Sequence, residues 1–374
     1  MSFSKPTQNT VYEYTQVAQR HGSLPLTGSP HYPPPRSGPS HSSNNRPEEQ
    51  NIDVPMVVMD ENGNSYTGLR PGNYIENGRE YHGFHRGKYM FPCDEKELDR
   101  LDMFHKFFEV TRGKHRSAPL NLEQPGNLIR ILDVGTGTGI WAIDIIDQLL
   151  AFGVPPEKLY AIGCDLVPCQ PQSIPPGLSF RQMDFESPWT GLGLEDWDLI
   201  HMRMLNGSVA NWPEVYNKAY QLLKPGIGHI ELVELDMQPR CDDGTLPHDS
   251  PLIVWTRSLL QATEEYSKPL AYNVNTGPQL QQQGFEDIKH EIKRVPLSPW
   301  DTQDMQQREI GRWFNLCLTE SLEPLTLAPM IRVRSWTRAD VERLTQDARV
   351  DICSRRIHVY FEMHIWTARR PAKP

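Results

Sequence analysis

The sequence lacks the cysteine pattern of a zinc site or of a disulfide framework. Its six cysteines are scattered along 374 residues, with no Cys-x-x-Cys pair and no histidine at metal-ligand spacing. We therefore predict reduced thiols and no bound metal. The chain also lacks an apolar run of about 18 residues, and no amino-terminal apolar core follows a basic start. These absences predict a soluble intracellular protein with neither a membrane span nor a secretory signal.

Positive charge is also in short supply. The chain has 38 lysine and arginine residues against 47 aspartate and glutamate residues, which gives a net charge of -9. A protein that reads DNA by sequence needs a basic surface that faces the phosphates. We therefore expect no direct sequence-specific binding to DNA.

Large aliphatic side chains are scarce near the amino terminus. The segment HGSLPLTGSPHYPPPRSGPSHSSNNRPEEQN is rich in Pro, Ser, Gly and Asn, and it cannot bury enough apolar area to offset the entropy lost on ordering. We predict that residues 1–75 form a disordered tail and that residues 76–374 form one domain.

Regular structure is expected to begin near Tyr81 with a helix that precedes the first strand of the domain. Asp94 followed by Glu97 has the spacing of an N-cap with a capping box. Apolar residues then recur at helical spacing on one face: Leu98, Leu101, Phe104 and Phe108. His105 falls in the same stripe, where a histidine is more often structural than catalytic.

The stretch LIRILDVGTGTGIWAI, residues 128–143, organises the rest of the chain. It joins a short apolar, β-branched run to three glycines and then to a helical pattern, an order that predicts strand, tight loop and helix. Gly135, Gly137 and Gly139 permit positive φ and let a ligand approach the backbone. The new helix presents its unpaired amides at the same place.

Two cofactors are compatible with such a loop. Shifted to Gly137, the glycines fit a dinucleotide fingerprint acceptably, with alanine at the last position, so the glycines alone do not decide. The deciding residue is Asp133, whose carboxylate at the strand end would repel a pyrophosphate and attract the α-amino cation of S-adenosylmethionine. Asp165, the next acidic strand end, also lies further along than the roughly 20 residues typical of dinucleotide folds. We therefore predict S-adenosylmethionine as the cofactor.

The middle of the chain alternates strand and helix as a parallel sheet does. An acid at the end of the second strand, Asp165, is expected to accept hydrogen bonds from the ribose. Asp184 and Phe185 end the third strand and would meet the adenine, although Phe185 fits the core equally well. The fourth strand runs to Met204, and its carboxyl end should face the transferable methyl group. The predicted cofactor-binding residues are Asp133, Gly135, Thr136, Gly137, Gly139, Asp165, Asp184 and Phe185.

The fifth strand ends around Glu231 and Glu234, two acids that could line the pocket or face solvent. The sixth and last strands, GFEDIKHEIKRVPL and HVYFEMHIWTARRP, are separated by some sixty residues, mostly helical, at about 297–356. In the usual methyltransferase sheet these strands form a direct hairpin. We therefore predict an α/β class I S-adenosylmethionine-dependent methyltransferase fold, with a seven-stranded, mostly parallel sheet, helices on both faces and a helical insertion. The insertion is expected to cover the acceptor pocket or to offer a partner surface.

Several segments together give the chain a family resemblance. YHGFHRGKYMFPCDEKELDRLDMFHKFF, ILDVGTGTGIWAIDI, MDFESPW, DWDLIHMRMLNGSVANWPEVY, PRCDDGTL and MHIWTARRP resemble the LaeA family of fungal regulators over roughly residues 79–372. The resemblance implies a nuclear protein, with the cytoplasm as a second location, that joins velvet-family proteins in a complex controlling secondary-metabolite gene clusters and sporulation. It also implies self-methylation on a methionine, which corresponds to Met204. The family's usual LIHLQMGCGS stands here as LIHMRMLNGS, and Met204 as an ordinary packed residue is the alternative.

The chemistry expected of such an acceptor matches what the sequence lacks. A thioether has a free lone pair and no proton to lose, so no general base is needed, and none is evident beyond His201, which lies within an apolar strand. Three functions remain open: a protein methyltransferase within a transcription-regulating complex, a non-catalytic binding module on the same frame, and a small-molecule methyltransferase of a biosynthetic pathway.

Overall fold

The computed structural model describes residues 57–59, 65–67, 72–120, 122, 128–300 and 303–373, all within one compact unit, residues 39–374. Strand β1 (Val57–Met59) pairs with β2 (Ser65–Thr67), and β3 (Tyr74–Glu76) pairs with β4 (Arg79–Tyr81). The boundary expected at residue 75 therefore falls inside a strand, because the short β-branched and aromatic runs find pairing partners there. The first 56 residues, for which disorder was predicted, lie outside the part of the chain that the structure describes.

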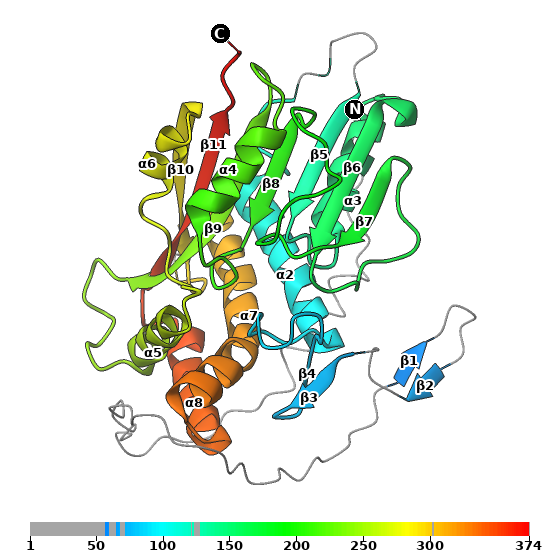
Figure 1. Ribbon diagram of the computed structural model, residues 1–374. Helices are drawn as coiled ribbons and strands as arrows, with labels where there is room; N and C mark the ends of the chain where they lie inside the picture. Colours follow the sequence, from blue (N-terminus) through cyan, green and yellow to red (C-terminus); the bar gives the residue numbers. More distant parts are fainter. Residues whose placement is uncertain are drawn as a thin grey trace. The chain divides into compact units, whose positions relative to one another are not determined.

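A seven-stranded sheet forms the centre of the described domain (Figure 1). Its strands, in spatial order, are β10 (Glu286–Pro296), β11 (Tyr360–Arg369), β9 (His229–Arg240), β8 (Leu199–Arg203), β5 (Ile129–Val134), β6 (Leu159–Asp165) and β7 (Leu178–Gln182). Strand β11 runs antiparallel to both of its neighbours, and the pairs from β9 to β7 are parallel. The predicted fold class is confirmed.

Helices cover both faces of this sheet. Helix α3 (Ile140–Ala151) lies on one face, and α4 (Trp212–Leu222) and α6 (Thr276–Gln282) lie on the other (Figure 1). Successive residues of β5 point to opposite faces, so Ile131 packs in the cluster with α3 while Leu132 packs in the cluster with α4. Because both faces are buried, β5 reads as a nearly continuous apolar run.

Helix α2 (Glu95–Arg112) precedes the sheet in sequence, as predicted. Asp94 is its N-cap, and the carboxylate accepts a hydrogen bond from the Glu97 amide at 3.1 Å. The expected capping box is not formed by Glu97, whose carboxylate instead accepts from the Arg100 guanidinium at 2.8 Å. The helix ends at Gly113, which has a φ of 66°.

The insertion between β10 and β11 is helical, as predicted. It consists of α7 (Met305–Ala328), a π-helical turn (Pro329–Val333) and α8 (Arg338–Cys353), and the remaining helices are α5 (Pro251–Glu265) and a short 3-10 turn (Pro156–Lys158). In Figure 1 the parallel strands run down towards α2 and α7. The two helices pack together, with the rings of Phe107 and Phe314 5.1 Å apart.

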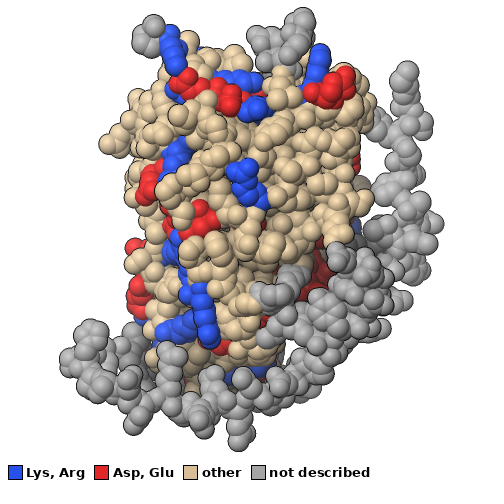
Figure 2. Space-filling model, turned by 45° about the vertical axis from the view of Figure 1, so that its right-hand side comes forward, with Lys and Arg blue, Asp and Glu red and all other residues tan. Residues whose placement is uncertain are grey.

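None of the helices in the described residues combines the length and apolarity needed to cross a bilayer. On the face shown in Figure 2, basic and acidic side chains are interspersed. Exposed ion pairs occur among the described residues, such as Arg369 with Asp287 at 2.7 Å.

Candidate active site

Two adjoining pockets lie at the carboxyl ends of the parallel strands. The first, which we call the β9 pocket, reaches Glu234 of β9 and has an empty volume of about 930 Å³ out to solvent. The second, the β6 pocket, reaches Asp165 of β6 and has an empty volume of about 830 Å³. Gly137 and Met204 line both pockets. Ligands of open α/β sheets bind at this edge.

The glycine loop has the geometry that the sequence predicted. Gly135, Gly137 and Gly139 have φ values of 70°, 57° and 83°, which L side chains rarely adopt. A Cβ added at Gly139 would lie 2.4 Å from the ring of Phe180, so this glycine is needed for packing. A Cβ added at Gly137 would meet only Leu101, at 3.4 Å. Gly137 therefore keeps open the space that a ligand can use.

Asp133 supports this loop from below. Only 3% of its surface is exposed, and its two carboxylate oxygens lie 2.8 Å from His201 Nδ1 and 2.6 Å from the Thr136 hydroxyl. Burial lowers the pKa of His201, although Asp133 opposes the shift. The imidazole ring of His201 stacks on Trp141, with the ring centroids 3.5 Å apart. Asp133 and Thr136 thus hold the loop together, and direct contact of Asp133 with a ligand amine stays a prediction.

Asp165 stands at the tip of β6 and lines the β6 pocket. One carboxylate oxygen accepts from the Gly137 amide at 2.8 Å and the other from the Val167 amide at 3.0 Å. Burial raises the pKa of Asp165, although these amides oppose the shift. A carboxylate has acceptor sites beyond two hydrogen bonds. The side chain is therefore both fixed in place and able to accept from a ligand diol.

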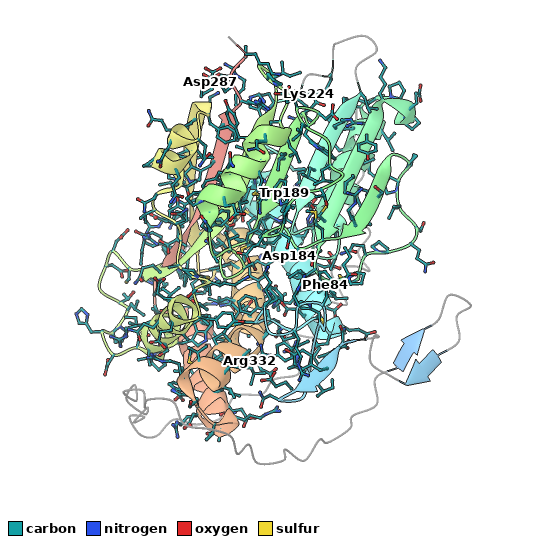
Figure 3. The ribbon with its side chains drawn as sticks, in the orientation of Figure 1. Phe84, Asp184, Trp189, Lys224, Asp287 and Arg332 are labelled. Atoms are coloured by element: carbon teal, nitrogen blue, oxygen red, sulfur yellow. The ribbon has the colours of Figure 1, made fainter. Side chains whose placement is uncertain are left out.

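Asp184 and Phe185 also line the β6 pocket, and Figure 3 labels Asp184 near the lower end of the sheet, far from Lys224 in this view. Lys88 forms an ion pair with Asp184, whose carboxylate also accepts from the Glu186 amide at 2.9 Å. Burial alone would raise the pKa of Asp184, but Lys88 and its other donors hold it below the ordinary value. Phe185 belongs both to the core and to the pocket wall, so packing in the core and contact with an adenine ring are compatible roles for it.

Sequence reasoning missed the segment that crosses the cleft before α2. Lys88 lines the β6 pocket, and Tyr89 lines both pockets. The Tyr266 hydroxyl of the α5 end donates to the Gly87 carbonyl and fixes the segment. No helical or strand periodicity marks this stretch, since it forms turns. The segment was part of the family resemblance, and the clustering of His, Lys and Tyr in HRGKYM is a signal that could have placed it at the site.

Met204 occupies the junction of the two pockets. It follows directly after β8, and its amide donates to the Val233 carbonyl at 3.0 Å. Its φ of 58° is unusual for a residue with a long side chain, and such strained positions concentrate at functional sites. The structure thus brings the predicted acceptor candidate to the same cleft as the predicted cofactor-binding residues.

The β9 pocket contains the buried polar side chains of Glu234 and Asn206 next to apolar residues. Glu234 accepts from the Leu205 amide at 2.8 Å and from the Asn206 amide at 3.3 Å. Burial raises the pKa of Glu234 to about 8. The side-chain amide of Asn206 has no hydrogen-bond partner among the described residues. The insertion contributes Leu318, Ser321 and Leu325 of α7 to the wall, in agreement with its expected role as a cover.

Glu234→Gln is expected to remove a pH dependence of stability. Because the folded-state pKa of Glu234 is raised to about 8, the folded state holds a proton that the unfolded state releases above about pH 4.3. Stability should therefore fall as pH rises from 5 to 8, by up to about 1.4 kcal/mol per unit. Denaturant unfolding of both proteins across this range measures the effect. Equal slopes with pH would show that Glu234 is already ionised in the fold.

Comparison with known proteins connects this cleft to a chemistry. A family model described as "Methyltransferase domain" matches residues 103–269, a range that contains the glycine loop and Met204. The chain is 53% identical over 302 residues to the secondary metabolism regulator LAE1 of Cochliobolus heterostrophus, covering 80% of this chain and 95% of that protein. It is 43% identical to the protein-methionine methyltransferase laeA of Emericella nidulans, covering 80% and 76%. Among solved structures, Haemonchus contortus phosphoethanolamine N-methyltransferase 2 in complex with S-adenosyl-L-methionine matches with a TM-score of 0.36, at 15% identity, over 73% of this chain and 57% of that chain.

Proposed function

The chain belongs to the LaeA/LAE1 family of secondary metabolism regulators and is an S-adenosylmethionine-dependent methyltransferase, and from this premise we propose that it methylates a methionine side chain, its own Met204. We further propose that this protein methyltransferase regulates secondary metabolism, as the names of its relatives state for them.

The residues of the cleft fit the cofactor. Asp165 offers fixed acceptors for the ribose hydroxyls, and Asp184 and Phe185 line the same pocket for the adenine. Gly137 leaves open space above the loop. When bound, the cofactor supplies a methyl group on a positively charged sulfur that is a good leaving group. The protein then has only to hold an acceptor in line with that methyl group.

Met204 can act as acceptor without help from a base. A lone pair on its sulfur forms the new bond to the methyl carbon, while the bond from that carbon to the cofactor sulfur breaks and its electrons stay on the departing sulfur. Met204 becomes a sulfonium, S-adenosylhomocysteine is left, and no proton moves. Because Glu234 holds its proton near neutral pH, it is not expected to act as a base here. The observation that carries the proposal is the position of Met204 where the two pockets meet.

Incubation with methyl-labelled S-adenosylmethionine tests the proposal. We expect the label to reside on the peptide that contains Met204, and Met204→Leu to abolish labelling of the protein. Leucine keeps the apolar volume and removes the nucleophile. Met237→Leu is the matched control, because Met237 lines only the β9 pocket, and this variant should be labelled like wild type. Label on another residue, or undiminished label in Met204→Leu, would contradict the proposal.

The cellular setting is proposed from the resemblance to the LaeA family. We propose that the chain works in the nucleus in a complex with velvet-family proteins, and that it regulates secondary-metabolite gene clusters and sporulation. Affinity purification of the full chain from nuclear extract should recover velvet-family proteins, and Met204→Leu should recover them equally if assembly does not depend on methylation. Recovery of none from an extract that contains them would contradict this part of the proposal.

A second function, methylation of a small molecule, is favoured by one observation. The side-chain amide of buried Asn206 lies in the lining of the β9 pocket and has no hydrogen-bond partner among the described residues, so it could bind a polar group of an acceptor. Under this alternative, the label would appear in added metabolites rather than in protein, and Asn206→Leu would reduce that turnover. Label confined to the protein would argue against it.

A further inference from the structure

Arg203 is the last residue of β8 and directly precedes Met204. Its guanidinium lies over the ring of Phe108 in α2, 4.8 Å from the centroid, and its Nη2 atom lies 3.2 Å from His105 Nδ1. Arg203 lines both the β9 pocket and the β6 pocket. The side chain therefore reaches the cleft on the side covered by α2.

This arginine has no carboxylate partner in the part of the chain that the structure describes. Arg203 is partly buried, and the three buried arginines of the described domain each bond a carboxylate: Arg79 with Asp94, Arg100 with Glu97, and Arg112 with Glu231. Among the described residues, no Asp or Glu lies within ion-pair distance of Arg203. Burial lowers its pKa to about 10, which reflects the cost of holding a cation without a counter-ion. An anion in the cleft would remove that cost.

His105 and Asp144 hold the guanidinium in position. A guanidinium only donates, so His105 Nδ1 accepts and its Nε2 carries the proton. This proton is donated to Asp144, whose Oδ2 lies 2.7 Å away. His105, Glu109, His115 and Asp144 lie close enough together to suggest a metal site. In this tautomer, however, His105 has no lone pair left for a metal, and it instead accepts a hydrogen bond from Arg203.

The start of α3 adds positive potential at the same place. The helix begins at Ile140 after Gly139, with no side-chain cap and no acidic residue in its first turn. Thr138 and Ile140 line the β9 pocket together with Arg203. The amides of a helix N-terminus favour anions, so helix and guanidinium act on the same part of the cleft.

We propose that Arg203 binds the carboxylate of S-adenosylmethionine, and that His105 and Asp144 are positioning residues for it. The inference rests on the cofactor assignment. With the ribose at Asp165 and the methyl group at Met204, the amino-acid end of the cofactor is left on the side of the glycine loop and α3. Its carboxylate is the one anionic group that the cofactor carries, and planar guanidinium groups match carboxylates in two hydrogen bonds.

Calorimetry with two ligands tests the proposal: S-adenosylmethionine and its decarboxylated analogue. Wild type should bind the intact cofactor roughly 10- to 100-fold more tightly than the analogue, as expected for charged hydrogen bonds. Arg203→Met should bind the two ligands with about equal affinity, and its affinity for the analogue should equal that of wild type. Arg203→Lys should keep part of the preference for the intact cofactor, because lysine retains the positive charge but cannot donate two parallel hydrogen bonds to a carboxylate. Thermal unfolding checks that each variant is folded.

His105 variants separate positioning from a merely structural role. His105→Asn keeps an acceptor near the position of Nδ1 and should retain most of the preference for the carboxylate, whereas His105→Leu should lose most of it. An undiminished preference in Arg203→Met would overturn the proposal, as would an equal loss of affinity for both ligands. Failure of Met204 to become labelled would leave these ratios unchanged. Failure of wild type to bind S-adenosylmethionine would instead overturn the cofactor assignment itself.

Discussion

Gly137→Val is expected to abolish measurable binding of S-adenosylmethionine while leaving the domain folded. A Cβ at this position meets only one protein atom, at 3.4 Å, so valine would project into the space that both pockets share. Loss of affinity by at least about 100-fold, or about 2.7 kcal/mol, should follow. The positive φ adds a stability cost on the order of 1–2 kcal/mol. Calorimetry and thermal unfolding measure the two effects separately.

Gly153→Val is the matched control. Gly153 has a φ of 83°, and a Cβ there would meet nothing within 4 Å, so the backbone strain is similar and the cleft is untouched. We expect a comparable loss of stability and unchanged affinity for S-adenosylmethionine. Near-wild-type affinity of Gly137→Val would place the cofactor elsewhere.

In cells, loss of regulation in Gly137→Val would favour an active methyltransferase, and intact regulation would favour a binding module.

Glu231→Gln should destabilise the fold by about 3–5 kcal/mol, because it leaves a buried charge without its partner. The Glu231 carboxylate is fully buried, forms an ion pair with the Arg112 guanidinium at 2.5 Å, and accepts from the Ser117 and Ala118 amides at 2.6 Å. Glutamine cannot balance the guanidinium and presents an amide group to donors. Denaturant unfolding at neutral pH measures the change. As a control, Glu342→Gln removes an exposed pair with Arg338 and should cost under about 1 kcal/mol.

The same ion pair predicts the acid limit of stability. Burial alone would raise the pKa of Glu231, but Arg112 and His201 outweigh it and hold the pKa below the ordinary value. The contribution is therefore fully present above the unfolded-state pKa, about 4.3, and is lost as pH falls through the folded-state pKa. Wild type should lose stability below about pH 4 more steeply than Glu231→Gln. Parallel acid curves would mean that the pair contributes nothing to acid stability.

The strand, loop and helix around Gly137 could be predicted because each depends on neighbours in the sequence. Hydrophobic period, glycine spacing and the N-cap of α2 are local signals, and the structure confirms them. The mostly parallel sheet could also be predicted, because strands that alternate with helices along the chain form parallel sheets. Even the insertion was visible, since it separates two strands that such sheets usually join directly.

Contacts between distant segments could not be predicted. Lys88 contacts Asp184 across 96 residues, and Arg203 contacts His105 across 98. Neither contact is indicated by a periodic pattern in the sequence. Glu231 and Glu234 looked equivalent, but an odd separation along a strand sends them to opposite faces. Glu231 therefore pairs with Arg112, while Glu234 lines the β9 pocket. The role of Asp133 beneath the loop depends on His201 in a neighbouring strand.

The nuclear Overhauser effect between the cofactor methyl group and the Met204 methyl group tests the central claim most directly. The protein would carry ¹³C-labelled methionine methyl groups, with Met204 identified by its missing signal in Met204→Leu. Spectra would be recorded directly after the addition of saturating methyl-labelled S-adenosylmethionine, before the methyl group has been transferred. We predict a strong cross-peak to Met204, which requires the two methyl groups to be neighbours. A bound cofactor whose methyl group shows cross-peaks to other methionines and none to Met204 would contradict the account.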